Sequence, residues 1–352
     1  MAPEPLVSVV TPFYNTQEYL GECIESVLSQ SYQKWEYVLV DNCSTDGSSE
    51  IAARYASRFS DRIRLIHTES FLSQVQNYNF ALSCISPDSK YCKMVQADDW
   101  IFPDCLRSMV GLAEAHPKVG IVSAYELEGD RAWLGAGLPY PSSEVSGREI
   151  CRQYFHRYLL VFGTPTSLLM RSDLVRSRDP FYDERWAPFE DFHACFDALL
   201  NWNFGFVHQV LTFSRRDNES MLSQIRSHQF EYFSRLSTIV AHGRDYLSED
   251  EYQAILQVAE RQYFWFLGQS ALERKGPEFW EFHRKHLASI GYSLDFRFMS
   301  KWVLAVLFDY IGNPKNTAEF LWRRRGRTLG PARRFIGAMR RTFVRKQVSE
   351  KL

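Results

Sequence analysis

The sequence lacks a long hydrophobic run and any closely paired cysteines. Its longest apolar tract near the C-terminus, Trp302–Phe308, falls far short of the ~20 residues needed to span a bilayer. No basic segment precedes an apolar one at the N-terminus, so a cleaved signal peptide is not expected. The seven cysteines are scattered and form no C-x-x-C pair. That argues against a zinc or disulfide framework and predicts a cytoplasmic location.

The composition is that of a folded chain with one unusual segment. Hydrophobic residues make up 45% of the 352 positions and aromatic residues 15%, enough for a sizeable core. The length predicts a main domain plus a substantial addition. The net charge of −1 conceals an asymmetry, because residues 323–346 hold ten basic residues and no acidic one.

The first half alternates between two hydrophobic patterns. Short β-branched runs predict strands at Val7–Val10, Tyr37–Val40, Ile63–Ile66, Tyr91–Val95 and Val119–Val122. Helical patterns lie between them, at Thr16–Ser29, Asp46–Arg58, Gln74–Cys84 and Pro103–Ala115. This alternation predicts an α/β fold with a mostly parallel sheet flanked by helices. Ligands bind such sheets beyond the carboxyl ends of their strands.

The second half reads differently. A loop rich in Gly, Pro and Ser follows at Gly135–Gly147, and from about residue 222 the pattern is helical and aromatic-rich. The predicted organisation is a catalytic domain at 1–220, a helical accessory region at 221–320 and a basic amphipathic tail at 321–352.

Three acidic clusters fall where strands end or helices begin. Asp41 ends the second strand ahead of an S-T-D-G turn. The turn accounts for Ser44 and Thr45 as helix caps, whereas Asp41 precedes the cap and is a candidate for ligand contact. Asp98 and Asp99 follow the fourth strand. They either face solvent near a helix N-terminus, worth only ~0.3–1 kcal/mol, or hold a divalent cation with substrate phosphates.

The third cluster, Glu190 and Asp191, opens an amphipathic helix. Acidic residues in a first turn complement the helix dipole, and they are also candidates for acid–base chemistry.

Taken together and in order, these segments resemble the family 2 inverting glycosyltransferases, which have the GT-A fold of nucleotide-diphospho-sugar transferases. The stretch SVVTPFYNTQEYLGECIESVLSQSYQKWEYVLVDNCSTDGS resembles the start of that family, QADDW its metal-binding D-x-D-D segment and FEDF its Glu-Asp helix start. The resemblance covers about residues 6 to 215.

The resemblance implies a role for each matching position. Asp191 is implied as general base, with Glu190 beside it, and Asp98 and Asp99 as ligands of Mn²⁺ or Mg²⁺. The implied nucleotide-sugar contacts are Thr11, Pro12, Tyr14, Asp41, Asn77, Asp98, Gly163 and Thr164. The implied reaction moves a sugar from a nucleotide-diphosphate sugar, most often a UDP-sugar, to a hydroxyl of a glycan or lipid-linked acceptor.

The chain departs from the family pattern at three places. Gln96 stands where the family commonly has the first Asp of D-x-D-D, and Asn42 replaces a frequent second Asp. The segment Phe213–Leu222 lacks the histidine that the family often has there.

Two other functions stay open. One is a sugar-phosphate nucleotidyltransferase, which usually carries a Gly-rich, basic phosphate loop after its first strand; this chain has TPFYNTQEYL there. The other is a catalytically silent nucleotide-sugar-binding scaffold.

The basic tail at 323–346 has three interpretations. Phe335, Met339 and Phe343 share one face at helical spacing, which favours an anionic membrane surface and a peripheral position on the inner face of the membrane. A solvated tail is the second. Nucleic acid is the least favoured, because no recognition fold accompanies the charge.

Overall fold

The computed structural model describes residues 3–129, 131–133, 138–157, 159, 162, 164–215, 228–313 and 315. The chain divides into two compact units, Met1–Ala259 with Ser289–Gly291, and Glu260–Ala288 with Tyr292–Leu352. The division falls inside one helix, α10 (Glu249–Leu272). The predicted domain limits at 220 and 320 stay predictions, since residues 216–227 and 316–352, and with them the basic tail, lie outside the described residues.

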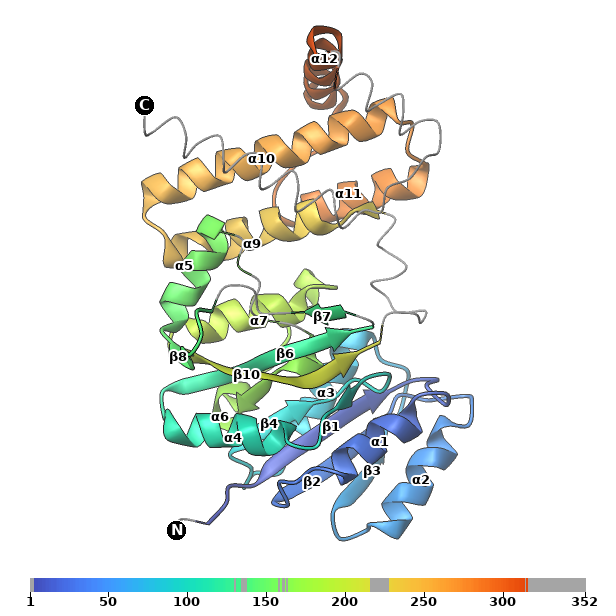
Figure 1. Ribbon diagram of the computed structural model, residues 1–352. Coiled ribbons are helices and arrows are strands. Elements are labelled where there is room, and N and C mark those ends of the chain that lie inside the picture. Colours follow the sequence, from blue (N-terminus) through green and yellow to red (C-terminus); the bar gives the residue numbers. More distant parts are fainter. Residues whose placement is uncertain are drawn as a thin grey trace. The chain divides into compact units, whose positions relative to one another are not determined.

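The first unit is built on one mixed sheet (Figure 1). Its strands lie in the order β3-β2-β1-β4-β9-β6-β10-β5, with β7 paired to β6 and β8 to β10. Their bounds are β1 Val7–Phe13, β2 Trp35–Asp41, β3 Ile63–His67, β4 Tyr91–Met94, β5 Trp100–Ile101, β6 Val119–Glu128, β7 Arg131–Trp133, β8 Glu144–Val145, β9 Leu169–Arg171 and β10 Asn203–Ser214. The predicted mostly parallel sheet is confirmed.

The strand directions bring distant loops to one edge. β1 pairs in parallel with β2 and β4, β2 with β3, and β6 with β10. β9 runs antiparallel to both β4 and β6, so β6 and β10 point the same way as β4. The carboxyl ends of six strands therefore meet at one edge of the sheet, where parallel sheets bind ligands.

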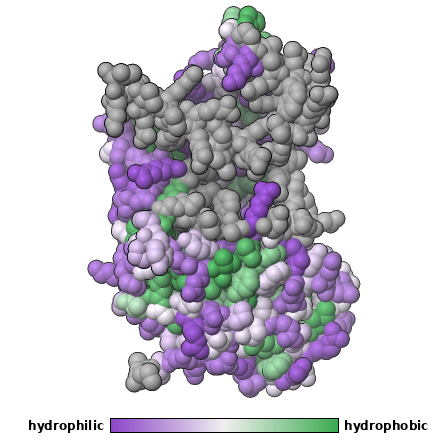
Figure 2. Space-filling model, in the orientation of Figure 1, coloured by the Kyte–Doolittle hydropathy of each residue, from purple (hydrophilic) through white to green (hydrophobic). Residues whose placement is uncertain are grey.

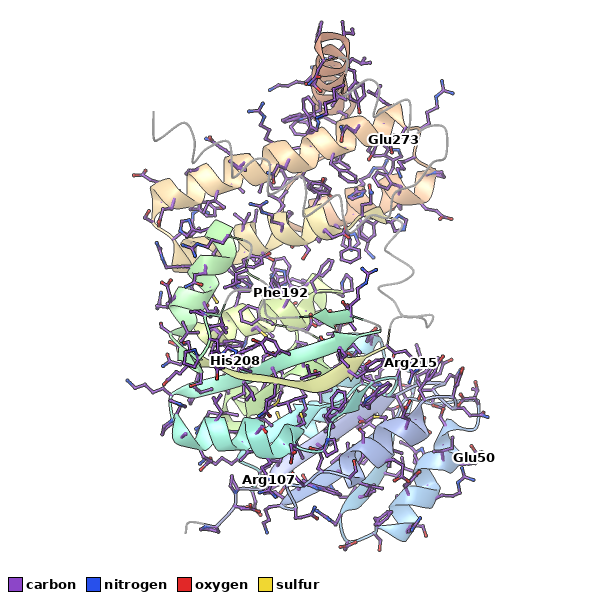
Figure 3. The ribbon with its side chains drawn as sticks, viewed as in Figure 1. Glu50, Arg107, Phe192, His208, Arg215 and Glu273 are labelled. Carbon is purple, nitrogen blue, oxygen red and sulfur yellow. The ribbon has the colours of Figure 1, made fainter. Side chains whose placement is uncertain are left out.

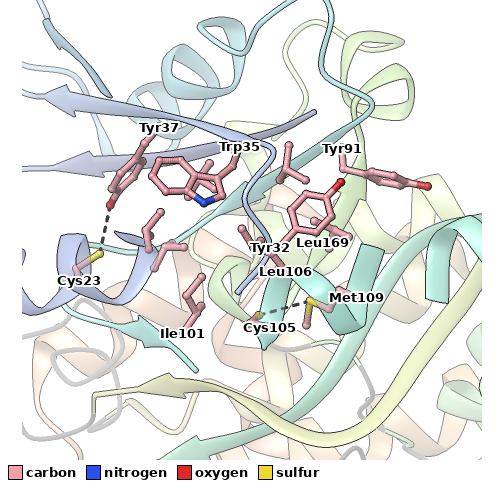
Figure 4. Packing of buried hydrophobic residues seen from close by; sticks show 14 of the residues in the cluster. Cys23, Tyr32, Trp35, Tyr37, Tyr91, Ile101, Cys105, Leu106, Met109 and Leu169 are labelled. Atoms are coloured by element: carbon pink, nitrogen blue, oxygen red, sulfur yellow. Dashed lines mark hydrogen bonds between the residues drawn. The ribbon is translucent and has the colours of Figure 1, made fainter. Parts of the chain in front are cut away.

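Helices cover both faces of this sheet. Their bounds in the first unit are α1 Leu20–Leu28, α2 Ser48–Arg58, α3 Gln74–Ser83, α4 Cys105–Ala115, α5 Gly147–Arg157, α6 Ser172–Arg176, α7 Glu190–Leu199 and α9 Glu231–Tyr246, with 3₁₀ turns η1 Pro165–Ser167 and η2 Glu184–Trp186. The main hydrophobic core lies between the sheet and α1, α2 and α4 (Figure 4). There alternate residues of β1 and β2, such as Val9 and Tyr37, meet the helices with no exposed surface.

Several elements differ from the sequence prediction, among them the first helix and β9. The helix predicted to start at Thr16 starts at Leu20. The backbone N–H of Thr16 donates to Ser48 Oγ (2.8 Å) and that of Gln17 to Asp46 Oδ2 (3.0 Å), which ties this segment to the turn after β2. β9 was not predicted. It is three residues long, and its pairing partners lie far away in the sequence.

The second unit is helical. It comprises the later part of α10, α11 (Pro277–Ser289) up to Ala288, and α12 (Phe296–Gly312). The Tyr263 hydroxyl lies 2.6 Å from His283 Nδ1, and the rings of Phe264 and Phe298 lie 4.6 Å apart. No helix in the described part of the chain is long and apolar enough to cross a membrane.

Candidate functional site

The loop after β1 is tied to the loop after β2. Asn15 has a left-handed backbone (φ 50°), which asparagine tolerates better than most residues. Its Oδ1 accepts from the Thr45 backbone N–H at 2.7 Å. Together with the bonds of Thr16 and Gln17 to the same turn, this contact makes the two motif segments one structural piece.

Asp41 lies at the end of β2 with only 3% of its surface exposed. Its Oδ1 accepts from the Ser44 N–H (2.9 Å), and its Oδ2 lies 3.2 Å from Nδ1 of the more exposed His67. Asp41 therefore takes part in forming the turn. Its predicted contact with the nucleotide base stays a prediction.

Asn42 connects this turn to the loop that follows β3. Its Nδ2 donates to the Leu72 carbonyl and its Oδ1 accepts from the Leu72 N–H, each at 2.9 Å. An aspartate could make only the second bond. The same loop carries Phe71, whose ring lies 4.8 Å from that of Tyr14 in an edge-to-face arrangement. Tyr14 and Phe71 are 43% and 62% exposed, so this aromatic pair offers a surface for a planar ligand.

The two aspartates after β4 have different surroundings. Asp98 is partly exposed, whereas Asp99 is buried. Asp99 Oδ2 accepts from the Thr166 hydroxyl (2.7 Å) and lies 3.3 Å from the Ser214 hydroxyl, and its Oδ1 accepts from the Arg215 N–H (3.0 Å). Burial and the neighbouring charge of Asp98 raise the pKa of Asp99 well above its usual value. Asp99 thus joins three segments, and Asp98 is the more accessible carboxylate.

A second buried acid, Glu126 of β6, was not predicted. Its Oε1 accepts from the hydroxyls of Ser214 and of Thr164, the latter at 3.3 Å. Lys93 lies beneath, fully buried, and donates to the carbonyls of Thr166 and Leu168. A cation there lowers the cost of burying Asp99 and Glu126. The sequence signal that could have indicated a buried acid was Lys93, a charged residue inside the apolar run that forms β4.

Arg215 extends this network beyond β10 (Figure 3). Its Nε donates to the Asp98 carbonyl at 3.1 Å and its Nη2 to Glu22 Oε2 at 2.6 Å. The guanidinium also lies 4.6 Å from the ring centre of Tyr19. The segment without the family's histidine therefore places an arginine beside the aspartate pair.

Gln96 makes a contact that an aspartate could not make. Its Nε2 donates to the hydroxyl of Tyr78 at 2.7 Å, and Gln74 Nε2 donates to the same oxygen at 2.7 Å. Burial raises the pKa of Tyr78, and the charges of Glu190 and Asp98 add to that effect. Tyr78 therefore lies near both the second and the third acidic cluster.

Glu190 and Asp191 form the first turn of α7. Glu190 is buried, and its Oε2 has no hydrogen-bond partner. Asp191 is partly exposed, and its Oδ1 accepts from the Phe192 N–H at 2.7 Å. Burial, with the adjacent Glu190 charge, raises the pKa of Asp191 to about 8. A carboxylate with so high a pKa is a stronger base than usual.

The remaining predicted contacts vary in accessibility. The Thr11 side chain is fully buried and bonds to the Val95 carbonyl and the Tyr37 hydroxyl, each at 2.8 Å, so only its main chain could face a ligand. Pro12 is buried in β1. Asn77 is 5% exposed, and its Oδ1 has no partner. Gly163 lies outside the described residues.

His193 does not line the open site. Its ring stacks on Trp186 at 4.1 Å, and its Nδ1 lies 2.9 Å from His242 Nε2 on α9. Burial lowers the pKa of His193 well below its usual value. The imidazole thus fastens α7 to α9 in its neutral form.

The described residues contain no group of three or more His, Cys, Asp or Glu side chains placed to hold a metal ion. Asp99 is buried and Asp98 is partly exposed, so Asp98 is the more accessible of the two carboxylates for a cation. One protein carboxylate, completed by substrate phosphates and water, fits the way Mg²⁺ is usually bound.

Comparison with known proteins bears on the family and the fold of the chain. Residues 8–177 match the sequence model described as Glycosyl transferase family 2. Residues 8–177 form a family 2 glycosyltransferase domain. EpsE of Bacillus subtilis is 36% identical over 152 residues, which cover 42% of this chain and 54% of EpsE.

A second relative is TarS, a poly(ribitol-phosphate) beta-N-acetylglucosaminyltransferase of Staphylococcus aureus. It is 25% identical over 198 residues, 56% of this chain and 33% of TarS. The chain thus matches about half the length of EpsE and a third of TarS.

Solved structures share the fold of this chain over more than the glycosyltransferase domain. S. aureus TarS 1–349 in complex with UDP-GlcNAc superposes with a TM-score of 0.58 at 19% identity, covering 80% of this chain and 79% of that one. The mannosyltransferase PcManGT of Pyrobaculum calidifontis, in complex with GDP-Man and Mn²⁺, gives 0.51 at 16% identity, covering 92% and 87%. The predicted GT-A fold with a C-terminal helical extension is confirmed.

Proposed function

We propose that the protein is an inverting glycosyltransferase that moves a sugar from a nucleotide-diphosphate sugar, a UDP-sugar, to a hydroxyl of a glycan or lipid-linked acceptor. The observation that carries the proposal is the position of Asp191, a partly exposed carboxylate in the first turn of α7 beside the buried Glu190, with its pKa raised to about 8. The named activity of TarS supports the donor class.

In this proposal Asp191 takes the proton of the acceptor hydroxyl as it attacks the anomeric carbon. Attack from the face opposite the leaving diphosphate inverts that carbon without a covalent enzyme intermediate. The nucleotide base packs against the exposed Tyr14–Phe71 pair, and Asp41 hydrogen-bonds to the edge of the base. Asp98 would hold the divalent ion, Mn²⁺ or Mg²⁺, which when bound offsets charge on the leaving diphosphate.

The two rival functions are less well supported. A nucleotidyltransferase needs free backbone N–H groups in its first loop to hold a triphosphate. Here the N–H groups of Asn15, Thr16 and Gln17 already donate to Ser44, Ser48 and Asp46. A catalytically silent scaffold does not require a carboxylate with a raised pKa in the first turn of α7.

The test is binding and turnover of UDP-, GDP-, CDP- and dTDP-sugars with Mn²⁺, Mg²⁺ or EDTA. Asp98→Ala should weaken metal-dependent donor binding, and Asp191→Asn should retain binding and lose turnover by about 10²-fold or more. Asp88→Asn, an exposed carboxylate change elsewhere on the first unit, is the matched control. Binding without turnover that Asp191→Asn leaves unchanged would favour the scaffold, and no binding of any nucleotide sugar would refute the proposal.

A further inference from the structure

Helix α12 has two apolar faces, and only one of them is packed. The inner face meets α10, where Val306 has no exposed surface and Phe298 lies against Phe264. The two helices approach closely at Gly268, where an added Cβ would lie 2.9 Å from the Trp302 carbonyl oxygen. The inner face therefore accounts for the folding of α12.

In the part of the chain that the structure describes, the opposite face of α12 is exposed. Four large apolar residues there, the outer face, are exposed: Leu304 (53%), Leu307 (37%), Phe308 (71%) and Ile311 (80%). Their spacing of three, four and seven residues places them in one stripe along the helix. Hydrophobic residues gather beside hydrophilic ones at the top of Figure 2, where Figure 1 draws α12. A contiguous exposed stripe of this kind marks a surface that binds something.

The charges around the outer face have one sign. Arg297 and Lys301 are exposed, and lie seven and three residues before Leu304, so they border the stripe. Lys315, beyond the end of α12 at Gly312, is also exposed. Asp309, the one acid of α12, is seven residues after Trp302 and so lies toward the inner face. The outer face is thus apolar with a cationic border.

Charge complementarity selects the occupant. A second copy packed on this face would bring like charges together. The chain's own residues 323–346 carry ten basic residues and no acid, so they too are repelled by a cationic border. An anionic surface attracts both the cationic border of the outer face and the basic residues 323–346. We propose that the outer face of α12 docks on an anionic lipid bilayer, independently of the proposed transferase activity.

In this proposal α12 lies at the surface of the bilayer and does not span it. The apolar side chains enter the boundary between headgroups and acyl chains, while the stems of Arg297 and Lys301 lie along it with their charges at the headgroups. Binding then depends on both the buried apolar surface and the lipid charge, and weakens as salt rises.

The experiment is flotation of the full chain with vesicles of phosphatidylcholine alone or mixed equally with phosphatidylglycerol. The wild-type chain should bind the mixed vesicles at least tenfold better. Leu304→Ser/Phe308→Ser/Ile311→Ser should lower that binding by about tenfold or more, and Arg297→Gln/Lys301→Gln by several-fold with a weaker salt dependence. Val258→Ser, an equally conservative change at another exposed apolar residue (49%), should bind like wild type.

Circular dichroism and the midpoint of thermal unfolding show that each variant is folded, and light scattering gives its oligomeric state. The proposal is overturned if the triple serine variant binds the mixed vesicles as wild type does, which would leave the tail as the sole anchor. It is equally overturned if wild type binds neither vesicle, binds both alike, or self-associates in a way that the triple variant abolishes.

Discussion

The amide of Gln96 donates to the hydroxyl of Tyr78 at 2.7 Å, across the gap between the loop after β4 and helix α3. Gln74 donates to the same oxygen. The residue that replaces a family aspartate thus joins a hydrogen-bonded unit whose tyrosine is influenced by both Asp98 and Glu190. A carboxylate at position 96 would add a third negative charge there and remove a donor.

Tyr78→Phe should lower the free energy of unfolding by about 1–2 kcal/mol, because it leaves two partly buried amide groups without their acceptor. Urea unfolding followed by fluorescence measures the change. Tyr55→Phe removes a hydroxyl that bonds the Glu25 carboxylate at the surface, and should cost less than about 0.5 kcal/mol. Equal losses for both variants would show that the Tyr78 hydroxyl has no special role.

Asn42→Asp should destabilise the protein by about 1–3 kcal/mol, since it removes the donor to the Leu72 carbonyl and buries a charge. The loop bearing Phe71 should loosen, so nucleotide affinity should fall as well. Urea unfolding and donor titration give the two quantities. Asn201→Asp, at an exposed position, is the control; a Asn42→Asp chain as stable as this control would contradict the bridging role of Asn42.

The two adjacent aspartates should separate into different roles. Asp99→Ala should cost about 2–4 kcal/mol of unfolding free energy, because the donors from Thr166 and Arg215 lose their acceptor, whereas Ser214 keeps its bond to Glu126. Asp99→Asn should cost less, since it keeps one acceptor oxygen. Asp98→Asn should cost less stability than Asp99→Ala, because Asp98 is partly exposed whereas Asp99 is buried, and it should raise the metal concentration needed for donor binding. Reversed effects of the two positions would contradict this division.

The raised pKa of Asp191 has consequences for activity and stability. As a base, Asp191 must be deprotonated, so kcat/KM should rise with pH through about 8. The folded state holds this proton more tightly than the unfolded state, whose carboxyl titrates near its usual value. The resulting stabilisation is therefore present at low pH and is lost as pH rises through about 8.

Thermal unfolding of wild type and Asp191→Asn from about pH 5 to about pH 9 tests the second consequence. Wild type should lose stability relative to the variant as pH rises. A constant difference between the two midpoints would mean that Asp191 has an ordinary pKa in the folded protein. A rise of kcat/KM through about pH 8 would then have to come from the titration of another group.

Local sequence was informative wherever one short segment carries its own pattern. The runs around Val7, Tyr37, Ile63, Tyr91 and Val119 became β1, β2, β3, β4 and β6, because buried parallel strands need continuous apolar residues. Parallel order then placed Asp41 and Asp98 at one edge of the sheet. The helix carrying Glu190 and Asp191 was predicted from its amphipathic spacing, and its observed start is Glu190.

Contacts between distant segments could not be predicted in this way. The bonds of Thr166 and Arg215 to Asp99 join positions 67 and 116 residues apart. Those of Thr164 and Ser214 to the buried Glu126 join positions 38 and 88 residues apart, and β9 pairs with the distant strands β4 and β6. No local pattern signals such pairings, because the chain must first fold before their donors and acceptors meet. For the same reason, the sequence could not predict that Asp98 and Asp99 have different surroundings. The sequence by itself determined that the pair ends a buried strand. Only the tertiary structure decided which carboxylate is enclosed by protein donors and which stays partly exposed to a ligand.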